Sequence, residues 1–196
     1  MGCNGIHKKV KTMDFKEMNP LGIIGIIGAI ILVVGVFLTW WTPDAAGAKN
    51  YSGWDIWNNV DNLFKARTYE EAVGTIKYSG FPCAFLPLVA LICGIISIVL
   101  MIIPTIMSKD KLGNIGGILG LIALILAVVV VICGILFYTG SATTEVTIAG
   151  VTTSTSAKIT EGAKIGIGFW LVLVGGIITM IGGLMPILKD KGIIKI

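Results

Sequence analysis

The side chains that could carry chemistry in this 196-residue chain are few, and four of them are cysteines. Cys3, Cys83, Cys93 and Cys133 form no Cys-x-x-Cys pair, the usual arrangement in thiol oxidoreductases. Cys83 and Cys133 lie toward the ends of two apolar segments, so they could meet and act as a redox pair. Because a free cysteine packs as a small hydrophobic side chain, apolar core positions are the favoured interpretation.

Other groups that bind metals or transfer protons are scarce. His7 is the only histidine, which excludes haem ligation by paired histidines and a His-rich metal site. The apolar segments contain no carboxylate or amine, whereas ion-coupled transporters and proton pumps generally need such groups within the membrane. The sequence therefore predicts no catalytic residue, no metal and no cofactor, and we do not expect an enzyme.

The elements that must position these residues are apolar. Hydrophobic residues make up 55% of the chain and charged residues 13%, against roughly 25% in soluble domains. Four stretches contain no Asp, Glu, Lys, Arg or His: 20–41, 81–107, 112–139 and 165–188. Each is long enough for a helix of about 20 residues, which crosses the hydrocarbon layer with its backbone bonded internally. We therefore expect an all-α membrane protein, a bundle of four transmembrane helices.

The distribution of basic residues predicts the orientation of these spans. Lysines are concentrated in the tails 1–19 and 189–196 and in the short link near residue 110, relative to the longer loops 42–80 and 140–164. The positive-inside rule then places both termini in the cytoplasm, in a multi-pass protein of the cell membrane. The net charge of +4 is explained by lysines that face anionic lipid, so no nucleic-acid partner is expected.

Glycines recur inside the spans at intervals that favour close helix packing. They are Gly28 and Gly35 in the first span, Gly116 and Gly120 in the third, and Gly168, Gly175 and Gly182 in the fourth. Since lipid tails are as apolar as leucine, membrane helices associate through the close backbone approach that small residues permit. Packing within one chain is favoured over packing between chains.

The first outer loop predicts a cap over the bundle. Trp54, Trp57 and Phe64 recur at helical spacing, which indicates a short amphipathic helix. A capping-box pattern at 68–71 predicts a second short helix. The aromatic residues are candidates for a partner surface; the alternative is that they anchor and cover the protein's own helices at the membrane interface.

Two further features belong to the outer loops. Asn50 begins an Asn-x-Ser glycosylation sequon on the predicted outer face. In the second loop, β-branched residues on either side of Ala149-Gly150 predict a small β-hairpin, whose edge could pair with a neighbour; a mobile Thr-rich loop is the alternative.

The topology and one short motif resemble the claudin and peripheral-myelin-protein superfamily. In that family the first outer loop carries a Trp, a Gly-Leu-Trp element and two disulfide-bonded cysteines, and it builds a small sheet. Trp41 corresponds to the first Trp, and the segment 53–57 to the second element. Gly-Leu-Trp is not intact here, and residues 42–80 contain no cysteine. The resemblance implies a self-associating membrane scaffold.

These observations predict a non-enzymatic membrane protein that acts by protein–protein contact. Its partners would be the lipid bilayer and either other membrane proteins or further copies of itself, as an accessory subunit or a claudin-like scaffold. An oligomeric pore or small-solute channel is the alternative, although no ring of charges is visible to set selectivity. A thiol-redox membrane enzyme that uses Cys83 and Cys133 ranks third.

Overall fold

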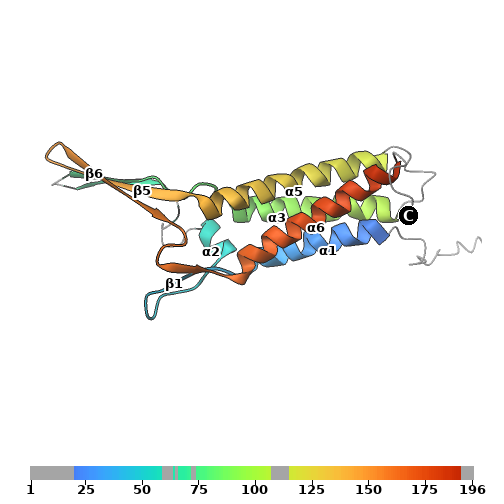
Figure 1. Cartoon of the computed structure of the whole chain (residues 1–196), viewed down its shortest axis with the longest axis horizontal. Helices are drawn as coiled ribbons and strands as arrows, with labels where there is room; N and C mark the ends of the chain where they lie inside the picture. Colours follow the sequence, from blue (N-terminus) through green and yellow to red (C-terminus); the bar gives the residue numbers. More distant parts are fainter. Residues whose placement is uncertain (1–19, 59–63, 65, 72–73, 107–114, 191–196) are drawn as a thin grey trace, which may run out of the picture.

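The computed structural model describes residues 20–58, 64, 66–71, 74–106 and 115–190 (Figure 1). The predicted amino-terminal tail with Cys3 and His7, the link around residue 110, and residues 191–196 of the predicted carboxyl-terminal tail lie outside the described residues. The helices are α1 (Pro20–Phe37), α2 (Gly53–Asn58), α3 (Leu86–Ile106), α5 (Ile115–Thr139) and α6 (Ile167–Asp190). The strands are β1 (Thr39–Pro43), β2 (Tyr51–Ser52), β3 (Arg67–Glu71), β4 (Gly74–Tyr78), β5 (Ser141–Ile148), β6 (Val151–Lys158) and β7 (Ala163–Ile165).

The long helices lie side by side, and the strands extend from one end of them (Figure 1). Helix α6 packs against α1 and α5, and α3 packs against the same two helices. Three helices contain segments long and apolar enough to cross a membrane: Leu86–Ile103, Gly117–Thr139 and Ile167–Leu184. The chain therefore has the helices of a membrane protein.

The helical surface has the side-chain distribution expected in lipid. Large aliphatic side chains such as Ile27, Ile95 and Ile125 are about half exposed on the outside of the helices. The buried hydroxyl of Thr179 lies inside and donates to the carbonyl oxygen of Gly175, one turn earlier, at 2.7 Å. Its hydrogen-bonding capacity is therefore satisfied within α6, as a polar group away from water requires.

The predicted bundle of four transmembrane helices is not borne out, because among the described residues three helices qualify as spans and the first predicted span is wrong in its extent. Helix α1 ends at Phe37, and its apolar part, Gly22–Phe37, is shorter than the apolar segments of the other three helices. The chain bends at Leu38, and the predicted last turn is strand β1 instead. Strand β1 pairs with β2 and β7, so tertiary hydrogen bonds at Trp41 and Thr42 replace the last helical turn.

The predicted all-α fold is wrong, because the described residues include two antiparallel sheets. One has the order β2-β1-β7 and the other the order β3-β4-β5-β6. In the first outer loop, the segment expected to form a second short helix is strand β3, paired along its whole length with β4. The expected amphipathic helix is only the six-residue α2, and Phe64 lies beyond its end.

The predicted hairpin in the second outer loop is present. Strands β5 and β6 pair from Ser141–Lys158 to Ile148–Val151 across the two-residue turn Ala149-Gly150. Both turn residues have positive φ, 50° and 82°, as a type I′ turn requires. This turn twists in the same sense as the strands, which explains how the hairpin continues for eight residues on each side.

Candidate interaction surface

The strands are joined to the helices by a cluster of aromatic rings. Trp40 is buried, and its Nε1 donates to the Gly35 carbonyl oxygen at 2.8 Å. Its indole meets Phe137 of α5 edge-on at 6.1 Å and Phe169 of α6 at 5.6 Å. Trp40 therefore packs between three long helices at the end from which the strands extend, and its orientation determines where β1 leaves them.

A second aromatic group continues from β1 into the first outer loop. Trp41 packs against Tyr51 and Phe64, with ring centroids 5.5 and 5.3 Å away, and Phe64 packs against Phe81. The Trp41 Nε1 donates to the carbonyl oxygen of Ile159, so the same side chain also holds the end of the second outer loop. Phe64 is 2% exposed and belongs to this core, so it offers little area to a partner.

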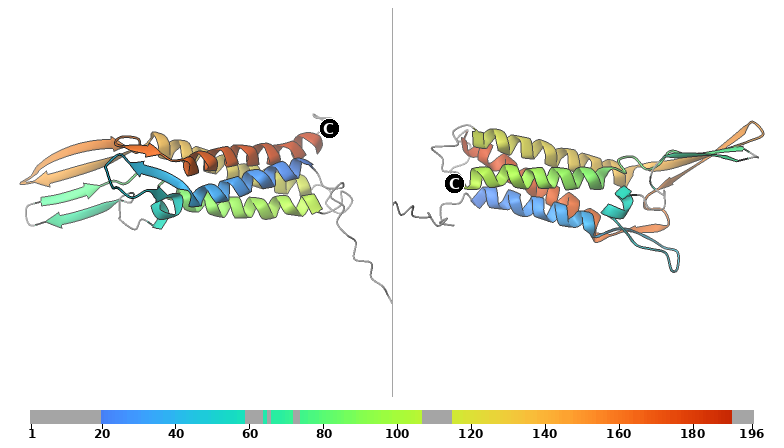
Figure 2. Two further views of the ribbon diagram at one scale, coloured as in Figure 1. Left: turned by 90° about the horizontal axis from the view of Figure 1, so that it is seen from below. Right: turned by 180° about the vertical axis from the view of Figure 1, so that it is seen from behind.

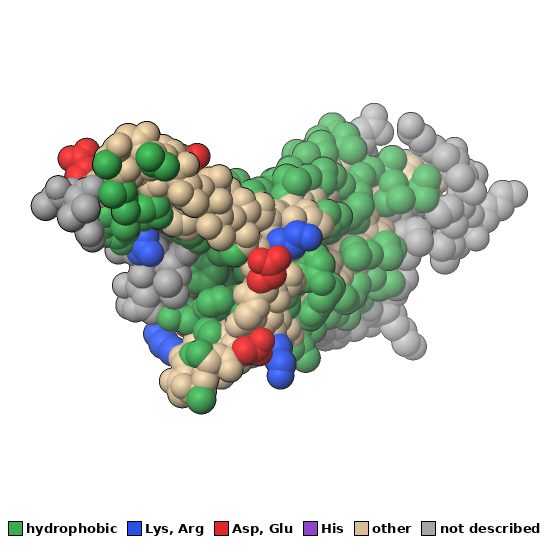
Figure 3. Space-filling view, turned by 60° about the vertical axis from the view of Figure 1, so that its left-hand side comes forward, with side chains coloured by type: hydrophobic (Ala, Val, Ile, Leu, Met, Phe, Trp, Pro, Cys, Tyr) green, Lys and Arg blue, Asp and Glu red, His purple; other side chains and the backbone are tan. Residues whose placement is uncertain are grey.

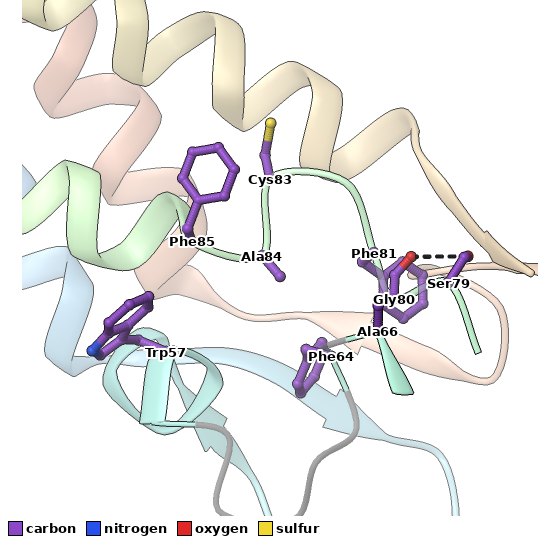
Figure 4. A pocket seen from close by; sticks show the side chains of 9 residues that line it. All are labelled: Trp57, Phe64, Ala66, Ser79, Gly80, Phe81, Cys83, Ala84 and Phe85. Atoms are coloured by element: carbon purple, nitrogen blue, oxygen red, sulfur yellow. Dashed lines mark hydrogen bonds between the residues drawn. The ribbon is translucent and has the colours of Figure 1, made fainter. Parts of the chain in front are cut away.

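The two tryptophans of α2, both candidate contact residues, have different surroundings. Trp54 is 39% exposed and packs on Phe37, at the outer end of α1, with the ring centroids 6.0 Å apart. Trp57 is half-buried and lines a hollow of about 250 Å³ together with Phe64, Phe81 and Phe85 (Figure 4). Of the three aromatic candidates, only Trp54 therefore presents its ring to the surroundings.

A local capping box determines where α2 begins. The Ser52 hydroxyl accepts from the Asp55 backbone N–H at 3.1 Å, and the Asp55 carboxylate accepts from the Ser52 N–H at 2.9 Å and from its hydroxyl at 2.8 Å. These bonds lower the pKa of Asp55 below its usual value, since they favour the charged carboxylate. Ser-x-x-Asp at 52–55 is the sequence pattern that could have located this helix start.

The glycines bring α6 close to α1 within one chain. A Cβ on Gly175 would lie 2.6 Å from the Leu32 backbone nitrogen, and one on Gly168 would lie 2.7 Å from the Gly35 carbonyl oxygen. Gly28 and Gly182 likewise face the backbone of the opposite helix, and the Gly120 carbonyl oxygen lies against Gly183, between α5 and α6. Of Gly116, the structure gives only its place in α5.

The four-stranded sheet projects away from the helices, and its two faces differ in chemistry (Figures 1 and 2). Directly paired residues share a face, and side chains alternate between faces along a strand. The register therefore places a set of apolar residues on one face, together with Thr144, Thr153 and Thr155: Tyr69, Ile76, Tyr78, Ala142, Val146, Ile148, Val151 and Ala157. We call this the apolar face.

The apolar face is not covered by the described chain toward the tip of the sheet. Val151 is 69% exposed, Ile148 49% and Tyr69 44%. Hydrophobic side chains therefore appear over the projecting strands as well as over the helices (Figure 3). Several exposed apolar side chains on one face mark contact with another molecule more often than an isolated exposed side chain does.

The opposite face, here called the polar face, carries Thr, Ser and charged residues. Lys77 of β4 lies opposite Glu145 of β5, which in turn lies opposite Ser154 of β6. The Thr147 and Thr152 hydroxyls are hydrogen-bonded across the hairpin at 2.9 Å. This face is suited to water, so the two faces of the sheet have different environments.

One cation lies on the apolar face, near the base of the sheet. The Arg67 guanidinium is 5.1 Å from the Tyr69 ring centroid and 5.5 Å from that of Tyr78. Burial raises the pKa of Tyr78, and the neighbouring positive charge of Arg67 acts in the opposite direction. The Arg67 guanidinium thus lies against both rings near the base of the sheet, although Tyr69 stays 44% exposed.

The edges of this sheet are also available. Every residue of β6 is exposed, and between Val151 and Ala157 this strand contains neither proline nor charge. Edge strands of proteins that avoid pairing commonly carry such groups. Both the apolar face and the β6 edge can therefore contact another chain.

Two of the cysteines lie close together, and one of them, Cys83, lines the hollow. Cys83 precedes α3 in the turn 82–85, outside the apolar span of that helix, and its thiol lies within hydrogen-bonding reach of Cys133 on α5. Burial raises the pKa of the Cys83 thiol to about 11. Cys93 is buried in the core. Within the described segments, no group of three or more His, Cys, Asp or Glu side chains is arranged to hold a metal ion.

Asn50 lies on the surface, immediately before β2, and is exposed. The third residue of its sequon, Ser52, is the capping residue of α2. The sequon therefore lies at the same end of the molecule as both sheets.

The apolar face does not follow from the sequence pattern at 68–71, which predicts a helix where the structure has strand β3. Alternation was visible in the sequence: Tyr69, Ile76 and Tyr78 on one side, with Thr68 and Lys77 on the other. The Thr-x-x-Glu pattern at 68–71 indicated a helix start, but strand pairing decided the conformation.

Comparisons with known proteins yielded no family model that matches the sequence, and no curated protein or solved structure matches it significantly. The resemblance to claudins therefore stays a prediction.

Proposed function

We propose that this chain is a non-enzymatic membrane protein that acts by protein–protein contact, as an accessory subunit of a membrane complex or as a self-associating scaffold. The contact surface is the apolar face of the four-stranded sheet, together with the adjoining β6 edge. Trp54 of α2, which packs on Phe37 at the end of α1, anchors the same end of the molecule at the membrane interface.

The observation that carries this proposal is the exposure of Tyr69, Ile148 and Val151 on one face of a sheet that stands clear of the helices. Because the sheet extends along the helix axes, its tip is directed away from the lipid that would surround them (Figure 2). Lipid therefore does not cover the aliphatic tip, and a protein surface is the occupant that fits an apolar sheet face outside the bilayer.

We further propose that the protein is a multi-pass protein of the cell membrane with both termini in the cytoplasm. The described ends Pro20 and Asp190 lie at the opposite end of the molecule from the strands. The lysine-rich tails continue from these two ends. The positive-inside rule then places the sheets outside the cytoplasm.

The test is the native mass of the protein extracted gently from its own membrane, compared between wild type and Val151→Lys. We expect the wild type to be a defined oligomer or to co-purify with other chains at fixed stoichiometry. Val151→Lys removes about 1.5 kcal/mol of apolar burial and adds a charge, so association should weaken by roughly tenfold or more.

Ser154→Lys is the matched control, because it changes the same strand on the polar face and places the new lysine opposite Glu145. It should assemble as the wild type does. A wild type that is a bare monomer would contradict the proposal. Equal assembly of the wild type and a folded Val151→Lys protein would show that the apolar face is not the contact surface.

A further inference from the structure

Cys83 occupies a backbone conformation that an L-residue rarely adopts. Its φ is 55°, and within the described residues it shares a positive φ without being glycine only with the turn residue Ala149. The left-handed region costs a non-glycine residue free energy, while glycine adopts it readily, as Gly80 does three residues earlier. A cysteine at a position that favours glycine indicates that the thiol itself has a role there.

The turn that carries Cys83 is held against α5 on both sides of the cysteine. The Pro82 ring lies against Gly140, directly after the end of α5, and a Leu86 methyl lies 3.8 Å from the position of a Cβ on Gly134. The Cys83 sulfur points toward α5, away from the side chains of Trp57 and Phe64 across the hollow (Figure 4). The backbone conformation and these two contacts together direct the thiol at Cys133.

The Cys133 thiol lies close enough to Cys83 to pair with it, and Cys93 is a second neighbour of Cys133. Cys83 and Cys133 are both half-buried and lie within hydrogen-bonding reach of each other. Cys93 is also a neighbour of Cys133, but it lies inside α3 and is buried in the core. Of the three described thiols, only Cys83 lies outside the apolar helices.

We propose that Cys83 and Cys133 form a disulfide that joins the start of α3 to the outer end of α5, beneath the base of the sheets. The proposal rests on the proposed orientation, because it requires this end of the helices to face an oxidising compartment. The bond would hold in place the turn from which β4 leads into α3.

The oxidant is an external disulfide, either of low molecular weight or in a thiol–disulfide exchange protein. One thiol loses its proton and attacks the external disulfide, which forms a mixed disulfide and releases one external thiolate. The second cysteine then loses its proton, attacks the protein sulfur of the mixed disulfide and releases the second external thiolate. Two protein thiols are oxidised, one external disulfide is reduced to two thiols, and no other electron acceptor is needed.

The experiment counts thiols in the full-length protein, purified from its membrane in the presence of a thiol-blocking reagent and denatured. With one disulfide, two of the four cysteines stay unreactive until a reductant is added. Peptide mass analysis should identify the linked pair as Cys83 and Cys133. Protein first reduced and then treated with oxidised glutathione should regain the same pair, faster at alkaline pH because the Cys83 pKa is high.

Two variants make the outcome specific. Cys83→Gly removes one thiol at a position whose φ suits glycine, so the variant should fold and lose the protected pair. Cys93→Ser should retain it. Four reactive thiols in both native and glutathione-treated wild type would overturn the proposal, and so would a pair that includes Cys93 or links two chains.

The count is made on denatured chains, so it is independent of assembly. A monomeric protein with the Cys83–Cys133 bond would support the disulfide while contradicting the proposed function. An assembled protein whose thiols all stay reactive after oxidation would support the proposed function and contradict the disulfide.

Discussion

At the scale of single residues, Trp40 and Trp54 have the same side chain in two different environments. Both lie near the outer ends of apolar helices, where tryptophan commonly anchors a protein at the membrane interface. Trp54 keeps 39% of its surface exposed, whereas Trp40 is 1% exposed and has its indole N–H paired with the Gly35 carbonyl. The difference follows from β1, since its pairing with β2 and β7 leads Trp40 into the space between Phe137 and Phe169.

Asp55 provides a prediction about pH. Its pKa is lowered in the folded protein, chiefly by the hydrogen bond from the Ser52 backbone and then by that from the Ser52 hydroxyl. A lowered pKa contributes stability that is present above the unfolded-state value of 3.8 and is lost as the pH falls through the lower, folded-state value. The melting temperature of the wild type should therefore exceed that of Asp55→Asn at neutral pH, and the difference should shrink in strong acid.

The control is Asp44→Asn, which changes an exposed carboxylate in the same loop. It should leave the melting temperature close to that of the wild type, since no described side-chain hydrogen bond is removed. A wild-type advantage over Asp55→Asn that does not depend on pH would contradict the capping role of the carboxylate.

At the scale of elements, the contact between α1 and α6 depends on glycine because backbone faces backbone. Gly175 approaches the Leu32 nitrogen and the Gly28 carbonyl oxygen. These are backbone atoms, which cannot move away by a change of rotamer as a side chain can. The next residue, Gly176, faces the Val131 methyl group on α5 at 3.1 Å. Gly175 therefore faces α1, where backbone atoms leave no room for a methyl group, and Gly176 faces α5, where a side chain can move to accept one.

Gly175→Ala and Gly176→Ala form a matched pair for testing this contact. Both gain about 1 kcal/mol in helix propensity. Gly175→Ala should in addition incur an overpacking cost of about 1–3 kcal/mol, because α1 must move away from α6. Thermal unfolding of the detergent-solubilised protein should therefore give a lower melting temperature for Gly175→Ala than for Gly176→Ala. Equal melting temperatures would indicate that the two helices separate at little cost.

The element scale also separates what the sequence could predict from what it could not. The β5–β6 hairpin was predictable, because its turn and its alternation lie within 18 consecutive residues. The pairing of β4 with β5 was not, since Tyr78 and Thr144 come from different outer loops and two long helices intervene. Short-range patterns contain no information about which strand will be adjacent.

At the scale of the whole molecule, the proposed orientation predicts which groups are accessible from outside the cell. Ser154→Cys introduces an exposed thiol on the polar face of β6. A membrane-impermeant thiol reagent should label it in intact cells, whereas Cys3 in the amino-terminal tail should be labelled only after permeabilisation.

On expression in a eukaryotic cell, Asn50 should be glycosylated, and Asn50→Gln should abolish the mass shift.

The opposite labelling pattern, with Cys3 reactive in intact cells and Ser154→Cys protected, would invert the topology. It would also remove the oxidising environment that the Cys83–Cys133 bond requires. The contact surface on the sheet would then face the cytoplasm, and its partner would have to be sought there.

The sequence by itself determined that this is a membrane protein. Long runs without charge are a local property, and a backbone in lipid has to satisfy its hydrogen bonds within the segment. The capping box at 52–55 and the turn at 149–150 are local in the same sense, since neighbouring residues supply every bond they need.

Only the tertiary structure decided that α1 ends at Phe37, that Phe64 is buried, that β3 to β6 share one apolar face and that Cys83 meets Cys133. Each of these depends on contacts between segments far apart in the chain. Their free energy comes from strand pairing and ring packing, which can outweigh local propensities of a few tenths of a kcal/mol per residue. The candidate interaction surface is of this kind, because an exposed face exists only once four strands from two loops have assembled.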